Sequence, residues 1–323
     1  MRVVEAGMRE RLTEEMMVPM NETGRGVVME AWRAERERLE EEMGERITLD
    51  ALTGPVGGGV EGLRDDAGGA AGWLIAQRKG GHRHSIDDVL TAWYALENSP
   101  RVGEHLDLGT GIGTVGLLTL WGMGEGARLA CVEAQAVSWR LLQANIGVNG
   151  LGGRVESRQG DLRETEFGRK FPLITGSPPY FPAGSGVLPV DAQKAHARFE
   201  LRGDVRDYAV AAARQLEIGG WFVLCFPTPQ KERALEGIAA AGLRTVRRRD
   251  VIPRETLGAL FTLFACRHAA DAEGGREEEE VPLTVRERSG RLTAEMAAVR
   301  RGFGFADGPA HGGHGQEVQS TAL

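Results

Sequence analysis

The sequence of 323 residues contains few cysteines and lacks any long apolar run. Cys131, Cys225 and Cys266 are too few and too scattered for a disulfide framework, and none forms a C-x-x-C pair. Each lies in an apolar run typical of a strand, so we expect buried, reduced thiols. No segment approaches the ~20 apolar residues of a membrane helix, and the N-terminal residues lack the apolar core of a signal peptide. We therefore expect a cytoplasmic protein without a membrane partner.

A large excess of charge of one sign is also lacking. The formal net charge of −7 argues against a surface that binds nucleic acid everywhere, but it leaves room for a local basic face. The histidines His311 and His314 stand in the C-terminal tail with no other metal-ligating residues nearby in sequence, so we predict no metal site.

The composition divides the chain into four predicted regions. Residues 1–72 form a charged, Gly-rich arm with a thin apolar stripe, which we interpret as partly disordered and as a possible contact for a protein partner. Residues 73–270 form the main domain. Residues 271–305 are an acidic spacer with a C-terminal strand and helix extension, and 306–323 a disordered tail.

Strands and helices alternate through the main domain, which predicts an α/β fold whose parallel sheet carries helices on both faces. The last two strands have no helix between them and should pair antiparallel at the sheet edge. An additional strand is expected at 73–79, and Ser85 should be the N-cap of a helix over 86–96. The remaining strands are predicted near 104–108, 128–133, 154–158, 172–176, 219–226, 243–249 and 259–267, and the remaining helices near 113–123, 135–148, 204–216 and 229–241.

The segment 105–116, H-L-D-L-G-T-G-I-G-T-V-G, runs from a short strand through a glycine-rich turn into a helix. Gly109, Gly111 and Gly113, with Thr110 between them, allow the backbone to approach a ligand closely. The helix that follows offers unpaired N–H groups. This pattern predicts a nucleotide-containing cofactor.

Two cofactor classes fit this loop. Gly111, Gly113 and Gly116 match the G-x-G-x-x-G fingerprint of dinucleotide-binding dehydrogenases. The D-x-G-x-G-x-G pattern that begins at Asp107 is instead the form found in methyltransferases, and the acid suits a cationic cofactor better than a pyrophosphate. The loop by itself leaves both classes open.

Two more acids follow the next two strands. Glu133 ends the predicted strand 128–133, where a carboxylate can accept both ribose hydroxyls of a nucleotide. Asp161 follows the third strand and can accept from an adenine amino group, or it can cap the short stretch Leu162–Phe167. Because the carboxyl ends of parallel strands share one edge of the sheet, the acids of three successive strands indicate a single cofactor site.

The motif Ser177-Pro178-Pro179-Tyr180 follows an apolar strand that stops at Gly176. The prolines fix their backbone φ and have no N–H, so carbonyl oxygens are available to a substrate amine. Ser177 adds a hydroxyl acceptor, and Tyr180 a flat face on which a base or an amide can stack. Two acceptors that hold the hydrogens of a planar amine can turn its lone pair toward a methyl donor. We therefore predict these four residues to be catalytic.

With this motif in place, the sequence resembles the class I S-adenosylmethionine-dependent amino-methyltransferases. More narrowly, the segments 81–93, 177–182 and 193–200 are similar to the tRNA1(Val) adenine-N6 methyltransferase family. The resemblance covers 73–267 and, less closely, 282–303. It implies a Rossmann-like fold with a seven-stranded, mostly parallel sheet, S-adenosyl-L-methionine as the donor, and an adenine of a tRNA anticodon loop as the acceptor, hence a role in tRNA processing by RNA methylation.

The resemblance also assigns roles to residues. Asp107, Gly109 and Gly111 match the donor loop, Glu133 the ribose acid, and 177–180 the target-amine motif. The family usually has asparagine where Ser177 stands. Serine keeps an acceptor without the reach of the amide, and Ser-Pro-Pro-Tyr also occurs in some cytosine-N4 methyltransferases.

Two further interpretations of the same motif remain open, a protein glutamine N-methyltransferase and a non-catalytic scaffold that activates a partner methyltransferase. Beyond the motif, we expect a basic rim that holds RNA phosphates, or alternatively a solvated face. The cations expected there are Lys194, His196, Arg198, Arg202, Arg247, Arg248, Arg249 and Arg254.

Overall fold

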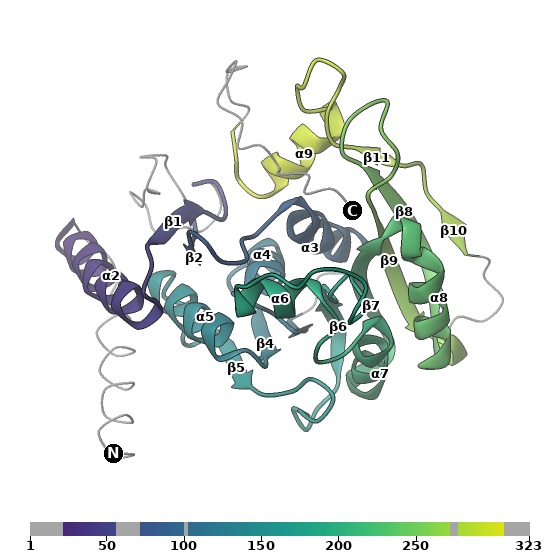
Figure 1. Cartoon of the computed structure of the whole chain (residues 1–323), viewed down its shortest axis with the longest axis horizontal. Helices are drawn as coiled ribbons and strands as arrows, with labels where there is room; N and C mark the ends of the chain where they lie inside the picture. The colour runs from purple at the N-terminus through teal and green to yellow at the C-terminus, as the bar shows by residue number, and fades with distance from the viewer. Residues whose placement is uncertain (1–21, 56–71, 100–102, 272–276, 307–323) are drawn as a thin grey trace.

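The computed structural model describes residues 22–55, 72–99, 103–271 and 277–306 (Figure 1). The tail histidines His311 and His314 and most of the Gly-rich connection lie outside these ranges. Within the described ranges, no helix is long and apolar enough to cross a membrane.

One twisted sheet forms the centre of the molecule, and all seven strands predicted for it are present. Their order across the sheet is β8-β9-β7-β6-β3-β4-β5. Neighbouring strands pair parallel except β9, which lies antiparallel between β7 and β8. The predicted α/β class with a mostly parallel sheet and an antiparallel strand near one edge is therefore confirmed. The bounds are β3 Glu104–Leu108, β4 Arg128–Glu133, β5 Val155–Gln159, β6 Phe171–Gly176, β7 Leu216–Pro227, β8 Leu243–Ile252 and β9 Phe261–His268.

The sheet has nine strands rather than the seven implied by the family resemblance. The two additional strands are β10 (Glu278–Glu279) and β11 (Leu283–Thr284), both paired parallel to the outer side of β8. Each is two residues long, too short for an alternating pattern that a sequence could reveal. They belong to the predicted C-terminal extension, which thus continues the sheet.

Helices cover both faces of the sheet, as the alternation predicts. Successive strand residues point to opposite faces, and two apolar clusters result. One cluster contains side chains of α3, α4 and α5, and the other side chains of α7 and α8. Ser85 is the N-cap of α3, as predicted. The bounds are α3 Ile86–Asn98, α4 Thr114–Met123, α5 Ala136–Val148, α6 Ala192–Arg198, α7 Val205–Gln215 and α8 Lys231–Ala240.

The described part of the N-terminal arm packs on the main domain. It consists of α2 (Glu22–Met43) and β1 (Ile47–Ala51), which pairs antiparallel with β2 (Leu74–Arg78). Leu39 and Ile47 are fully buried, and Arg140 of α5 bonds Glu35 of α2 at 2.6 Å. This segment therefore differs from the loose arm expected for it, because its few apolar residues face the core. The predicted domain boundaries stay a prediction.

Two asparagines, Asn145 of α5 and its C-cap Asn149, complete the outer side of β2. Asn149 bonds both the N–H and the C=O of Leu74, and Asn145 bonds both backbone groups of Ala76. Asn145 also donates to the carbonyl of Ile112 in the glycine loop, at 2.9 Å. The amides take the place of a neighbouring strand, so the edge of β2 is satisfied without further pairing.

The C-terminal extension packs in the apolar cluster that contains the side chains of α3, α4 and α5. After β11 the chain turns into α9 (Ala294–Gly302), whose Met296 and Val299 are buried, followed by the buried Phe303. The carbonyl of Phe303 accepts from the N–H of Gly54, so the N-terminal and C-terminal additions meet. The strand and helix expected in this extension are both present.

Candidate active site

The glycine loop lies between β3 and α4, where the sequence places it. Gly109, Gly111 and Gly113 all have positive φ, at +58°, +61° and +100°. A Cβ on Gly109 would lie 2.0 Å from the hydroxyl of Tyr208, so that position has neither the conformation nor the space for a side chain. Around Gly111 a Cβ would meet nothing within 4 Å, which leaves open space beside the loop.

The side chain of Asp107 stabilises the conformation of this loop by hydrogen bonds. Its buried carboxylate accepts from the hydroxyl of Thr110 at 2.5 Å, from the N–H of Gly116 at 3.0 Å and from the hydroxyl of Thr175 at 2.7 Å. Burial raises the pKa of Asp107, and these three donors act in the opposite direction. The carboxylate thus joins the loop, α4 and β6. Its direct contact with a cofactor stays a prediction.

Glu133 lies beside the loop at the end of β4. One carboxylate oxygen accepts from the N–H of Gly111 at 2.8 Å, and the other from the N–H of Gln135 at 2.6 Å. The side chain is almost fully buried, and this burial raises its pKa. The loop and the expected ribose acid are therefore in direct contact. Binding of a ribose by this acid remains a prediction.

Asp161 follows β5, the next strand in the sheet. Its carboxylate accepts from the backbone N–H of Arg163 and pairs with the Arg163 guanidinium at 2.6 Å. These contacts with Arg163 lower its pKa. The stretch Leu162–Phe167 is a turn, not the short helix considered for it. The carboxylate faces its own turn, and its role toward an adenine stays a prediction.

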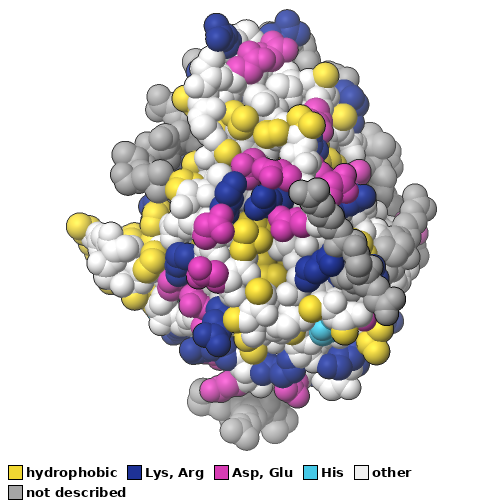
Figure 2. Space-filling model, turned by 90° about the vertical axis from the view of Figure 1, so that its right-hand side faces the viewer, with side chains coloured by type: hydrophobic (Ala, Val, Ile, Leu, Met, Phe, Trp, Pro, Cys, Tyr) yellow, Lys and Arg dark blue, Asp and Glu magenta, His cyan; other side chains and the backbone are white. Residues whose placement is uncertain are grey.

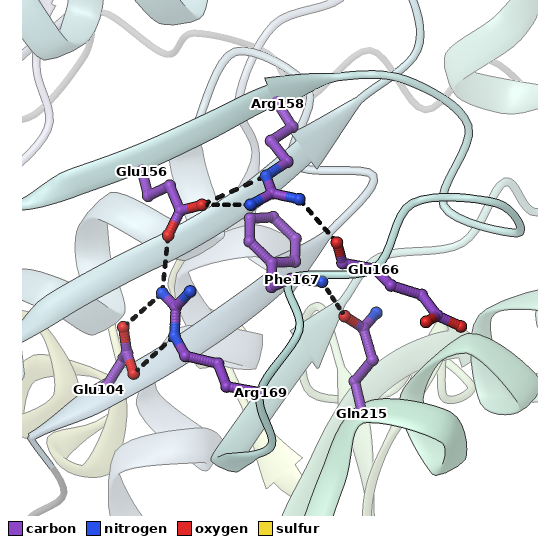
Figure 3. A network of polar contacts seen from close by, with 7 residues as sticks. All are labelled: Glu104, Glu156, Arg158, Glu166, Phe167, Arg169 and Gln215. Atoms are coloured by element: carbon purple, nitrogen blue, oxygen red, sulfur yellow. Dashed lines mark hydrogen bonds and ion pairs between the residues drawn. The ribbon is translucent and has the colours of Figure 1, made fainter.

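The turn that carries Asp161 is fixed by a polar network (Figure 3). Arg158 stands over the ring of Phe167 at 4.4 Å and donates to the carbonyl of Glu166. Gln215 of α7 accepts from the N–H of Phe167. Arg169 joins Glu156 of β5 to Glu104 of β3 at 2.8 and 2.7 Å. These contacts attach the segment 166–169, which follows the turn, to β3, β5 and α7.

The predicted catalytic motif 177–180 begins where β6 ends, and Gly176 pairs with Leu108 at the start of the glycine loop. The two predicted elements thus lie side by side. The hydroxyl of Ser177 is 3.4 Å from the sulfur of Cys225. The hydroxyl of Tyr180 donates to Asp87 at 2.7 Å, and the Tyr180 ring meets Phe226 edge to face at 6.1 Å.

The prolines Pro178 and Pro179 lie between these anchored residues. The carbonyl of Tyr180 accepts from the side chain of Gln230 at 3.0 Å, whereas the carbonyls of Pro178 and Pro179 accept no hydrogen bond from any of the described residues. The motif therefore has a fixed C-terminal end and two carbonyls available to an acceptor amine.

Three residues around the motif were not identified from the sequence. Asp87 stands in the helix predicted over 86–96, Cys225 in a predicted buried strand and Gln230 in the helix predicted near 229–241, and no functional role was predicted for any of them. Burial raises the pKa of the Cys225 thiol to about 12, so it lies near Ser177 as a neutral thiol. A usable signal existed for Cys225, since it stands near the carboxyl end of a strand adjacent to β6. The contact of Asp87 with Tyr180 spans 93 residues and has no local signal.

Three of the cations expected in a basic rim beside the motif form ion pairs within the protein. Arg247 pairs with Glu278 at 3.0 Å and Arg248 with Glu277 at 2.9 Å, both from the acidic spacer. Arg249 pairs with Glu295 of α9 at 2.8 Å. Figure 2, which faces the side where β8 and β10 lie in Figure 1, shows basic and acidic side chains intermixed across its middle. The arginines of β8 are therefore neutralised and do not form a phosphate-binding rim.

The cations that follow the motif are different. Lys194, Arg198 and Arg202 make no ion pair with any carboxylate of the described ranges.

Across those same ranges, no group of three or more His, Cys, Asp or Glu side chains is arranged to hold a metal ion.

The sheet order and the glycine loop are those of the class I methyltransferase fold. A solved structure titled a predicted O-methyltransferase from Agrobacterium tumefaciens matches with a TM-score of 0.50 at 18% identity, and the match covers 67% of this chain and 96% of that one. At this identity the likeness concerns the fold, and it confirms the predicted fold class. No family model matches the chain.

Curated relatives are similar in sequence. One from Actinobacillus succinogenes is 28% identical over 224 residues, which are 67% of this chain and 86% of the relative. One from Actinobacillus pleuropneumoniae serotype 7 is 25% identical over 171 residues, 53% of this chain and 70% of the relative. Both are named tRNA1(Val) (adenine(37)-N6)-methyltransferase. The family resemblance seen in the sequence is thereby confirmed. The sequence relatives and the fold neighbour all carry methyltransferase names, and the chain is an enzyme of this class.

Proposed function

We propose that this protein transfers a methyl group from S-adenosyl-L-methionine to the N6 amine of an adenine in tRNA. The observation that carries the proposal is the position of Ser177-Pro178-Pro179-Tyr180 at the end of β6, directly beside the glycine loop at the end of β3. A methyl donor in the loop and an amine at the motif would then be neighbours. The names of the curated relatives support tRNA as the acceptor.

The residues of the loop fit this cofactor. Open space lies beside Gly111, and Glu133 presents a buried carboxylate at the same place. A carboxylate at the end of the second strand can accept the two hydroxyls of a ribose. When bound, S-adenosyl-L-methionine supplies a methyl group on a sulfonium sulfur, which is an electrophile for an amine lone pair. In the proposal Gly109, Gly111 and Gly113 admit the cofactor and Glu133 holds its ribose.

The motif would position the amine. An exocyclic adenine amine is a weak nucleophile, because its lone pair is delocalised into the ring. The hydroxyl of Ser177 and a carbonyl of Pro178 or Pro179 would accept its two hydrogens and so turn the lone pair out of conjugation. No general base is required in this scheme, since the amine proton can leave to water. Tyr180, held by Asp87 and Gln230, would give the base a flat surface.

The test is to incubate the protein with isotope-labelled S-adenosyl-L-methionine and unmodified bulk tRNA, and to identify labelled nucleosides by mass spectrometry. We expect labelled N6-methyladenosine. A Ser177→Ala variant, tested in parallel, should bind the cofactor and lose most of the label. Label on cytosine would move the proposal to another exocyclic amine. Label on a protein glutamine would replace RNA as the acceptor, and absence of cofactor binding would favour a non-catalytic scaffold.

A further inference from the structure

The chain exposes apolar side chains immediately after the motif. In the loop of residues 183–190, Val187 is 95%, Leu188 47% and Val190 105% exposed. Water contact with three large aliphatic side chains at one place is unfavourable for a surface without a partner, and such groups mark interaction sites. The loop starts three residues beyond Tyr180, so a partner that contacts it lies next to the acceptor position.

The loop belongs to a longer segment, residues 182–198, and the chain just before this segment is hydrogen-bonded to the chain at its end. The N–H groups of Tyr180 and Phe181 donate to the carbonyl of Arg198 at 3.1 and 2.9 Å, and Glu200 donates back to Phe181 at 2.8 Å. The rings of Phe181 and Phe199 are in contact at 5.4 Å. Residues 182–198 therefore form a long loop whose two ends are held together, and the loop follows directly on the predicted catalytic motif.

The return arm of this long loop is attached to the core of the molecule. Asp191 caps α6 through the N–H of Lys194 and pairs with Arg78 of β2 at 2.7 Å. The buried Gln193 bonds Arg78 and the hydroxyl of Ser138. With both arms anchored, the apolar tip keeps a defined position relative to Ser177.

Cations flank the tip. Lys194 and Arg198 lie on α6, and Arg202 follows four residues later with its guanidinium on the carbonyl of Ala134. Arg198 stands over the ring of Phe181 at 5.7 Å. None of the three forms an ion pair with a carboxylate of the described part of the chain, although Asp191 lies within electrostatic reach of Lys194, and Glu133 and Asp161 of Arg202. An apolar tip bordered by cations is complementary to a nucleic acid whose bases are unstacked and whose phosphates run alongside.

We propose that loop 183–190 is the RNA-contacting element of this enzyme. Val187, Leu188 and Val190 insert against the faces of the unpaired bases next to the target adenine, and Lys194, Arg198 and Arg202 bind the neighbouring phosphates. Apolar wedges between bases are a known means of holding a nucleic acid open, and an RNA loop presents its bases unpaired. This inference rests on the proposed function and names the part of the surface that selects a single-stranded RNA loop.

The experiment compares the triple variant V187S/L188S/V190S with the control I218S, which changes a residue 90% exposed at the start of β7. Affinity for a tRNA anticodon stem-loop is measured by fluorescence anisotropy, cofactor affinity by calorimetry, and methylation by label transfer. We expect the triple variant to bind the stem-loop about tenfold more weakly. Its cofactor affinity, and both affinities of I218S, should stay unchanged. Because the three side chains are exposed, the fold should not be affected.

The possible failures are distinguishable. If the wild-type protein methylates the stem-loop and the triple variant binds it as tightly, the inference is wrong while the proposed function stands. If the wild-type protein neither binds nor methylates any RNA, both the inference about loop 183–190 and the proposed function are wrong. If sedimentation shows that the triple variant abolishes a self-association of the wild type with RNA affinity unchanged, the tip is a contact between copies of the chain, which also overturns the inference.

Discussion

Two regions of this molecule carry clusters of cations, and they differ in what surrounds them. On β8, Arg247, Arg248 and Arg249 each pair with a glutamate of the C-terminal extension. On and after α6, Lys194 and Arg198 have no such partner in the part of the chain that the structure describes. The first region is neutralised and closes an edge of the sheet, whereas the second is open and stands beside the catalytic motif. The comparison predicts that a basic segment binds phosphates only where no ion pair neutralises its cations.

The largest expected effect concerns the acceptor side. Tyr180→Ala should lower the rate of methyl transfer by at least about a hundredfold, because a misplaced acceptor loses the alignment on which the reaction depends. Cofactor affinity should stay nearly unchanged, since the side-chain contacts of Tyr180 are with Asp87, Cys225 and Phe226, which lie outside the glycine loop. Single-turnover label transfer and calorimetry measure the two quantities.

Tyr180→Phe is the matched control for this variant. It keeps the ring and removes the hydroxyl with its contacts to Asp87 and to the sulfur of Cys225, so we expect an intermediate loss of rate. A collapse of cofactor binding in Tyr180→Ala would contradict the separate roles of the two elements.

The second prediction tests the comparison of the two cation clusters directly. K194Q/R198Q/R202Q should weaken tRNA binding about tenfold near physiological salt and reduce the salt slope of log affinity by about 2, because up to three phosphate contacts are lost. R247Q/R248Q/R249Q removes the same number of charges from β8 and should leave tRNA affinity within about twofold. Filter binding over a series of salt concentrations is the measurement. Equal losses in both variants would mean that the ion pairs on β8 open to admit RNA.

The two cation clusters also show which structural features could be predicted from the sequence and which could not. The seven strands and the two site motifs were predictable, because apolar runs, glycines and prolines act locally. The strand β1 was missed, since only Ile47 and Leu49 of I-T-L-D-A face the core. The ion pair of Arg247 could not be predicted from its own segment. Its partner Glu278 lies 31 residues further along the chain, in the two-residue strand β10 that pairs with β8.

The same limit applies within the site. The sequence placed the three acids at adjacent strand ends, and the fold does bring them to one edge of the sheet. It did not reveal that Asp107 bonds only its own loop, helix and neighbouring strand, or that Asp161 faces Arg163. Periodicity tells which strand end a residue occupies, but the direction of its side chain depends on donors from other segments.

A smaller effect is expected from removing the acids that neutralise β8. E277Q/E278Q/E279Q/E280Q should strengthen tRNA binding about threefold at low salt and steepen its salt dependence, because the exposed arginines become available to phosphates. The control removes four acids that make no ion pair in the described parts of the chain, at Glu41, Glu217, Glu232 and Glu236. If the control strengthens binding equally, net charge explains the effect and the position of the glutamates does not.

The smallest effect concerns the stability that a paired network supplies, for which Glu156 is the clearest case. Burial acts to raise its pKa, but the hydrogen bonds from Arg169 and Arg158 prevail and hold it below its ordinary value of 4.5. The stabilisation from a lowered pKa is present above the ordinary value and is lost as the pH falls through the folded-state value. Because Glu156 is 41% exposed, solvent screening limits the contribution to about 0.5 kcal/mol. Urea unfolding between pH 3 and 7 should show wild type slightly more stable than Glu156→Gln at pH 7, with the difference vanishing toward pH 3. A difference that stayed constant with pH would assign the effect to packing rather than to charge.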